Sequence, residues 1–160
     1  MKPLKTYLQI GALIICSLAW SGISHGATSV NSNRKVIMVI VSEQRLLALE
    51  GYTIVHEFDV VTGRAGKETT HGKYTIFRKH KDYTSKTYDV EMPYTMFFSK
   101  DGKAIHGTQW ATLRSYVHAY VTESVGSQGC VGMTAEDART MFEWAPMNTR
   151  IVILEEEPDE

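Results

Sequence analysis

Short apolar runs separated by glycine-marked turns dominate the chain between residues 35 and 154. The uninterrupted apolar run at 36–41 has the length and β-branched composition of a strand, and 46–49 has the pattern of its returning hairpin arm. Further strands are predicted over residues 54–62, 73–78, 92–98 and 103–106. Many short strands at close spacing, joined by turns that contain glycine, are typical of a β-sandwich or barrel.

Helical spacing is clear in one place, after Thr134. Thr134 and Asp137 form a start that resembles a capping box, and Pro146 ends the segment. The apolar residues at helical intervals between them are Ala138, Met141, Phe142 and Ala145. A last strand is predicted over 150–154, before an acidic tail at 155–160. The sequence therefore predicts a mainly β fold with one principal helix, in a single domain over residues 35–154.

The polar segment at 79–91, KHKDYTSKTYDVE, has no clear periodicity. Its length and composition fit either a long hairpin or a lid, and the sequence does not decide between them.

The first 26 residues have the three parts of a secretory signal. Lys2 and Lys5 precede an apolar run at 8–20, and the small and turn-prone residues SGISHGA follow. The run is shorter than the roughly 20 residues that a membrane-spanning helix needs. We expect cleavage after Gly26 and export to the periplasm or cell envelope, with no stable membrane span. A retained anchor is the alternative.

Charge and motif content exclude several function classes. The chain of 160 residues has 17 Lys and Arg against 18 Asp and Glu, with no basic stripe. A nucleic-acid groove needs clustered cations, so we expect no nucleic-acid partner. The sequence has no CxxC or HExxH motif and no His pair one helical turn apart, so we expect no metal. GxSxG, GxGxxG and the phosphate loop are also absent from it, and no cofactor is predicted.

Removal of the signal would leave Cys130 as the single cysteine. An unpaired thiol in an oxidising compartment is reactive, forms an intermolecular disulfide, or is a buried apolar residue that only packs. Gly126, Gly129 and Gly132 surround this cysteine, and such glycines permit positive φ and converging backbone N–H groups. The helix that begins after Thr134 is expected to favour the thiolate modestly.

A nucleophilic cysteine also needs a base. Five histidines follow the signal, at positions 56, 71, 80, 106 and 118. His106 ends a predicted strand and precedes Gly107, which makes it the candidate. Taken singly, each of these histidines fits a structural role better than a catalytic one.

Several motifs together resemble one family, the YkuD-type catalytic domain of L,D-transpeptidases. They are HG at 106–107, SQGC at 127–130 followed by an apolar residue and Met133, and the helix start TAEDA. The upstream segments QRLLALEGY, TTHGKY and MPYTMFF resemble family segments in the same order, so that the resemblance covers residues 35–154. It implies an L,D-transpeptidase-like β-sandwich of the bacterial envelope that uses no metal. In this family a cysteine attacks the carbonyl before the terminal D-alanine of a peptidoglycan stem peptide, and an amine acceptor resolves the thioester.

The resemblance also implies roles for residues. Cys130 would be the nucleophile and His106 the base and later the acid, with the imidazole oriented by the backbone carbonyl of Gly107. Backbone N–H groups near Gly129 and Cys130 would hold the oxyanion. Ser127 and Gln128 of the same loop belong to this oxyanion-holding and orienting set, and the candidate substrate contacts are Tyr94, Trp110 and Arg114.

The chain departs from the family pattern in three ways. Gln128 stands where the common motif has histidine, and an amide cannot exchange a proton near neutral pH. Gly132 stands where the motif has an arginine that can bind a carboxylate. That contact with the substrate is lost unless Arg114 or Arg139 substitutes for the arginine. The segment between His106 and Cys130 is longer than usual. These departures concern substrate choice more than sulfur activation.

The favoured hypothesis is a periplasmic transpeptidase that acts on peptidoglycan stem peptides and transfers them to an amine acceptor. A wall-linked protein is one candidate for that acceptor. One alternative is an L,D-carboxypeptidase or amidase on the same scaffold, in which water resolves the thioester. The other is a non-catalytic wall-binding module, for which Gln128 and Gly132 are the main support.

Overall fold

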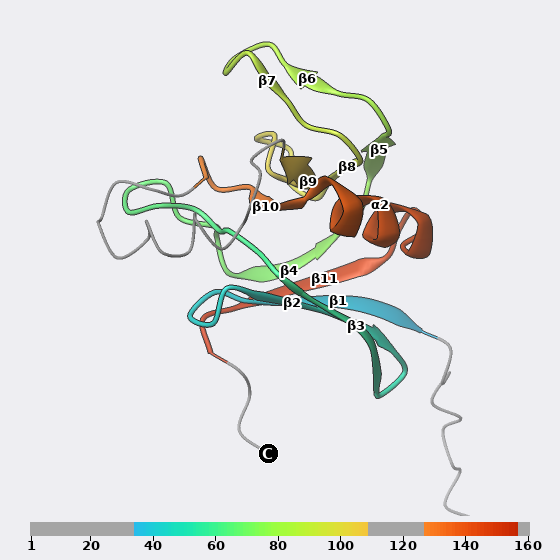
Figure 1. The fold of residues 1–160 in the computed structure, drawn as a ribbon. Coiled ribbons are helices and arrows are strands. Elements are labelled where there is room, and N and C mark those ends of the chain that lie inside the picture. Colours follow the sequence, from blue (N-terminus) through green and yellow to red (C-terminus); the bar gives the residue numbers. More distant parts are fainter. Residues whose placement is uncertain (1–33, 109–126, 157–160) are drawn as a thin grey trace, which may run out of the picture.

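The computed structural model describes residues 34–108 and 127–156, which form two main sheets, a two-stranded ribbon and one helix (Figure 1). The signal-like segment, Trp110, Arg114 and the end of the acidic tail lie outside the described residues. In the described ranges, no helix has the length and apolarity needed to cross a membrane.

The larger sheet has five strands in the order β3-β2-β1-β11-β4. Their bounds are β1 Lys35–Ile40, β2 Arg45–Glu50, β3 Thr53–Asp59, β4 Gly72–Thr75 and β11 Arg150–Leu154. Neighbouring strands are antiparallel except β1 and β11, which run parallel. β1, β2 and β11 are at or near their predicted positions, because their apolar runs supply the buried face of this sheet.

The smaller sheet has four strands in the order β10-β9-β8-β5. Their bounds are β5 Arg78–His80, β8 Thr95–Phe97, β9 Ala104–Thr108 and β10 Val131–Thr134. The strand predicted over 73–78 is in fact broken at Ile76 and Phe77, where the chain leaves β4 of one sheet and enters β5 of the other. The backbone N–H of Ile76 still bonds Thr149 next to the large sheet, whereas that of Phe77 already bonds Phe97 in the small one.

The polar segment at 79–91 forms a hairpin. Its paired strands are β6 (Thr84–Ser85) and β7 (Val90–Glu91), which make a separate two-stranded ribbon. The hairpin extends from the small sheet, away from the five-stranded sheet (Figure 1).

The predicted helix is α2 (Ala135–Trp144), and it packs against β8, β9 and β10. Thr134 caps its N-terminus, since its hydroxyl accepts a hydrogen bond from the backbone N–H of Asp137 at 3.1 Å. Met141 and Ala138 are fully buried in one core cluster with residues of both sheets, such as Ile37, Ile105 and Ile151. The helix therefore joins the two sheets through a common core, as a layered fold requires.

Parallel pairing of β9 with β10 brings together the two motifs that the sequence singled out. Val131 pairs with Ile105 and Gly132 with His106. Cys130, one residue before the first pair, therefore lies next to Ala104. Side chains alternate between the faces of a strand, so Cys130, Ala104 and His106 share the face opposite to the one that Ile105 presents to the core.

Gly107 allows α2 to approach this strand pair closely, and this makes a stability test. A Cβ at position 107 would lie 3.0 Å from the Cα of Ala135 and 3.0 Å from Pro93, whereas the one tight contact of a Cβ at Gly132 would be a Thr108 methyl group at 3.2 Å, with the Val61 carbonyl oxygen at an ordinary 3.7 Å. We expect Gly107→Ala to lower the free energy of unfolding by about 1–3 kcal/mol through overpacking. Gly132→Ala, the matched control, should cost less than about 1 kcal/mol because a side-chain methyl can move. Urea unfolding of both variants measures the difference, and equal effects would contradict it.

Candidate active site around Cys130

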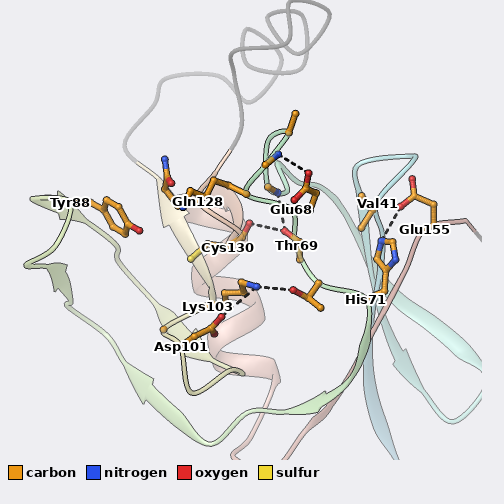
Figure 2. A pocket seen from close by; sticks show the side chains of 16 residues that line it. Val41, Glu68, Thr69, His71, Tyr88, Asp101, Lys103, Gln128, Cys130 and Glu155 are labelled. Carbon is orange, nitrogen blue, oxygen red and sulfur yellow. Dashed lines mark hydrogen bonds and ion pairs between the residues drawn. The ribbon is translucent and has the colours of Figure 1, made fainter.

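Cys130 lines a cavity of about 850 Å³ that is formed mainly by loop residues. The cavity is bounded by the loop at 63–71, the turn at 101–103, Tyr88 of the hairpin, Gln128 and Cys130 itself, with Val41 and Glu155 at its far end (Figure 2). Figure 2 shows the sulfur directed away from Thr69, toward the side of the cavity where Tyr88 lies.

The Cys130 side chain is half-buried between this cavity and a small apolar cluster. The cluster consists of Met92, Phe97 and Ala104, with Tyr83 packed against it. Burial raises the pKa of the Cys130 thiol, although a hydrogen bond from the Ala104 backbone opposes the shift. Burial therefore outweighs the modest preference for the thiolate that the sequence predicts from the helix. At neutral pH the resting residue is a thiol.

Two buried or half-buried hydroxyl groups hold the cysteine loop. The hydroxyl of Ser127 donates to the carbonyl of Cys130 at 2.5 Å and accepts from the N–H of Gly129 at 3.0 Å. The Thr69 hydroxyl donates to the carbonyl of Gly129 at 3.1 Å and accepts from the N–H of Gly63 at 2.9 Å. Thr69 is only 2% exposed, and it links the loop at 63–71 to the cysteine loop.

Sequence reasoning did not single out Thr69. Its only signal in the sequence is the segment TTHGKY, which resembles a segment of the family. The contact joins residues 60 positions apart in the chain, which no local pattern reveals.

Gly129 satisfies two constraints beside the sulfur. Its φ is +98°, a conformation that L side chains rarely adopt, and an added Cβ would lie 2.8 Å from Cε of Lys103. The prediction that glycine permits positive φ next to Cys130 is thus correct at this position. The Gly129 N–H is already bonded to Ser127, so it would have to exchange that partner to hold an oxyanion.

His106 is buried, with 8% of its surface exposed, and its Nδ1 lies 2.8 Å from the carbonyl oxygen of Gly107. A carbonyl can only accept, so Nδ1 carries the proton and Nε2 is the acceptor in the neutral ring. Burial lowers the pKa of His106, against the opposing effect of the Gly107 hydrogen bond. The imidazole is therefore neutral at pH 7, the form that can take up a proton.

His106 and Cys130 occupy diagonal positions on adjacent strands. Strand spacing and rise place two such Cα atoms about 8 Å apart, within the combined reach of a cysteine and an imidazole that share one face. His106 is not among the residues that line the cavity, whereas Cys130 is. Gly132, directly opposite His106, adds no side chain beside the ring.

Gln128, where the family pattern has histidine, lies next to Arg64. With its amide oxygen turned toward Arg64, it accepts from Nη1 at 2.9 Å and from Nη2 at 2.6 Å. The side chain lines the cavity as a neutral amide held by a guanidinium.

The remaining predicted residues lie elsewhere. Tyr94 packs against Phe142 of α2, with ring centroids 5.8 Å apart, and does not line the cavity. Arg139 pairs with Glu143 at 2.9 Å on the exposed side of the helix, so it does not replace the missing arginine in this structure. Trp110 and Arg114 lie outside the described residues. Among residues 34–108 and 127–156, no three side chains of the metal-ligating types come together.

Comparison with solved structures gives a consistent set of neighbours. An L,D-transpeptidase from Stackebrandtia nassauensis is 26% identical, with a TM-score of 0.66 over 78% of this chain and 57% of that one. The L,D-transpeptidase LdtMt1 in complex with imipenem is 14% identical, with a TM-score of 0.65 over 75% of this chain and 58% of that one. A mutant of the Enterococcus faecium L,D-transpeptidase is 19% identical, with a TM-score of 0.64 over 76% and 50%. The last two show the fold alone.

The chain spans only 50–58% of the length of these three structures. No curated protein matches it. The family model for the L,D-transpeptidase catalytic domain, YkuD, matches residues 34–153. That match covers nearly all of the predicted domain and includes both His106 and Cys130, and on this ground the chain belongs to the YkuD family of L,D-transpeptidase catalytic domains.

Proposed function

We propose that this protein is a cysteine acyltransferase that acts on peptidoglycan stem peptides. The observation that carries the proposal is the pairing of β9 with β10, by which a cavity-facing cysteine and a neutral buried imidazole share one face of a sheet. The signal-like residues 1–26 support action in the cell envelope, where this substrate is found.

The proposed first step starts from a neutral pair, a thiol and an imidazole. Nε2 of His106 takes the thiol proton as Sγ of Cys130 attacks the carbonyl carbon before the terminal D-alanine. The carbonyl oxygen becomes an oxyanion, held by backbone N–H groups of the cysteine loop, with the Gly129 N–H exchanging its bond to Ser127. The C–N bond then breaks, and the imidazolium gives its proton to the leaving amine. A thioester and free D-alanine result.

The second step reverses the roles. An acceptor amine attacks the thioester carbonyl, His106 takes a proton from the amine, and the sulfur leaves. The imidazolium returns that proton to the thiolate, so the enzyme is restored and a new amide bond has formed. Because Gly107 holds Nδ1, the same nitrogen, Nε2, handles the proton in both steps.

The direct test is incubation of the mature protein with disaccharide tetrapeptides. We expect release of D-alanine and a new cross-linked product, both absent with Cys130→Ala. Mass spectrometry of the muropeptides measures both. Loss of D-alanine without cross-links would identify a hydrolase on the same scaffold, whereas neither product, together with binding to sacculi that Cys130→Ala leaves unchanged, would favour the wall-binding module.

Acylation by a carbapenem isolates the sulfur step, since the similar fold of LdtMt1 was solved with imipenem. We expect one imipenem adduct by intact-protein mass spectrometry and none with Cys130→Ala. With His106→Ala the rate of adduct formation should fall by a factor of at least roughly 100, as loss of a general base predicts. His56→Ala on β3, outside the cavity, is the matched histidine control and should react at the wild-type rate. An adduct that forms equally fast without His106 would remove it from the role of base.

The pH dependence of that acylation follows from the two pKa shifts. The pKa of His106 lies below the ordinary 6.5, so the imidazole stays neutral to lower pH and the acid limb of the rate profile should fall below pH 6.5. The pKa of Cys130 lies above the ordinary 9.0, so His106→Ala should leave a rate that still rises with pH beyond pH 9. Stopped-flow rates between pH 4.5 and 10 measure both limbs. A wild-type acid limb centred above 6.5 would contradict the neutral pair.

A further inference from the structure

The charged residues that line the cavity differ in how far they are exposed to solvent. Its lining includes two lysines, at 67 and 103, and three carboxylates, at 68, 101 and 155. His71 pairs with Glu155 at 2.9 Å at the far end. Lys67 is exposed on its loop, whereas the Lys103 side chain is only 21% exposed. A charge with less solvent around it acts more strongly on a ligand, so Lys103 is the more effective cation of this cavity.

Lys103 lies directly beside the cysteine loop. It precedes Ala104, whose backbone bonds the Cys130 thiol, and its Cε occupies the space that a Cβ on Gly129 would need. The aliphatic stem therefore covers Gly129, while the ammonium group reaches past the loop into the cavity (Figure 2). This packing fixes the direction of a side chain that is flexible when exposed.

Two neighbours hold the ammonium group. Nζ donates to the Thr70 hydroxyl at 2.7 Å and lies 3.4 Å from a carboxylate oxygen of Asp101. A lysine ammonium has three N–H donors, and within the described part of the chain these two contacts leave one donor for a ligand. At 3.4 Å, Asp101 is a loose partner that does not occupy the ammonium group fully.

We infer that Lys103 binds the free carboxylate of the terminal D-residue of the donor peptide. This inference rests on the proposed function and names the specificity determinant of the same site. The carboxylate is one Cα away from the nitrogen of the bond to be cleaved, so it must enter beside Cys130. There it meets the carboxylates of Asp101 and Glu68, which repel it unless a cation is present. Gly132 supplies no such cation, and Lys103 is positioned to do so.

The test compares two donor peptides, the tetrapeptide with a free C-terminal carboxylate and the same peptide with a C-terminal carboxamide. Binding of both is measured by calorimetry in the Cys130→Ala protein, so that no turnover is needed. We expect the acid to bind roughly 10- to 100-fold more tightly than the amide, the range for a hydrogen bond to a charged group. Adding Lys103→Met should bring this ratio close to one.

Matched variants separate charge from packing. Methionine at 103 keeps a stem of similar length over Gly129, and Lys103→Arg keeps the charge and should retain much of the preference. Lys100→Met removes one positive charge from an exposed lysine of the same turn that does not line the cavity, and should leave the ratio unchanged. A wild-type ratio near one, no measurable binding of the acid, or a ratio that survives Lys103→Met would overturn the inference.

The outcome is distinguishable from failure of the proposed function. If the acid is preferred through Lys103 but the intact protein releases no D-alanine, the carboxylate site stands and the acyltransferase proposal fails. If the acid donor releases D-alanine and the amide donor releases D-alaninamide with equal kcat/KM, the function stands and the role of Lys103 fails.

Discussion

Parallel pairing between β9 and β10 is the constraint on which the site depends. The register that joins Val131 to Ile105 puts Cys130 beside Ala104 and on the same face as His106. A shift of one residue between the two strands would put the imidazole and the thiol on opposite faces of the sheet, because side chains alternate along a strand. On the other face of the sheet, α2 packs against this strand pair and holds the register. The helix can come this close because Gly107 has no side chain. The geometry of the sulfur thus depends on the packing of a helix behind it.

Burial gives both partners of the proposed reaction their neutral forms. The apolar cluster of Met92, Phe97 and Ala104 raises the pKa of the thiol, and the buried position of His106 lowers the pKa of the imidazole. A preformed ion pair is therefore disfavoured at rest, and the proton would move as the sulfur attacks. In such an arrangement the imidazole must be oriented in advance. The hydrogen bond between Nδ1 and the Gly107 carbonyl does this with an atom of the same strand.

The polar side of the site is assembled from several loops. Thr69 joins the loop at 63–71 to the cysteine loop, and Lys103 crosses Gly129 to reach Thr70. These contacts give a second reason, besides its positive φ, why residue 129 is a glycine: a Cβ there would collide with the Lys103 side chain. They also place the partly buried cation of the cavity on the turn before β9, and not on β10, where Gly132 has no side chain.

Local sequence determined the strands with continuous apolar runs and the capped helix after Thr134. It also singled out Cys130 and His106 as candidates. Each of these signals is contained within a few neighbouring residues of the chain. It did not reveal β10, since Val131–Thr134 contains a glycine and is held as a strand by its pairing with β9 and with Val61, both distant in the sequence. Nor did it show the break at Ile76 and Phe77, where the chain changes sheets. The protonation states, the Thr69 bridge and the position of Lys103 arise from burial and from contacts across 33 to 60 residues. Only the folded chain brings such distant groups together, so only the tertiary structure decided them.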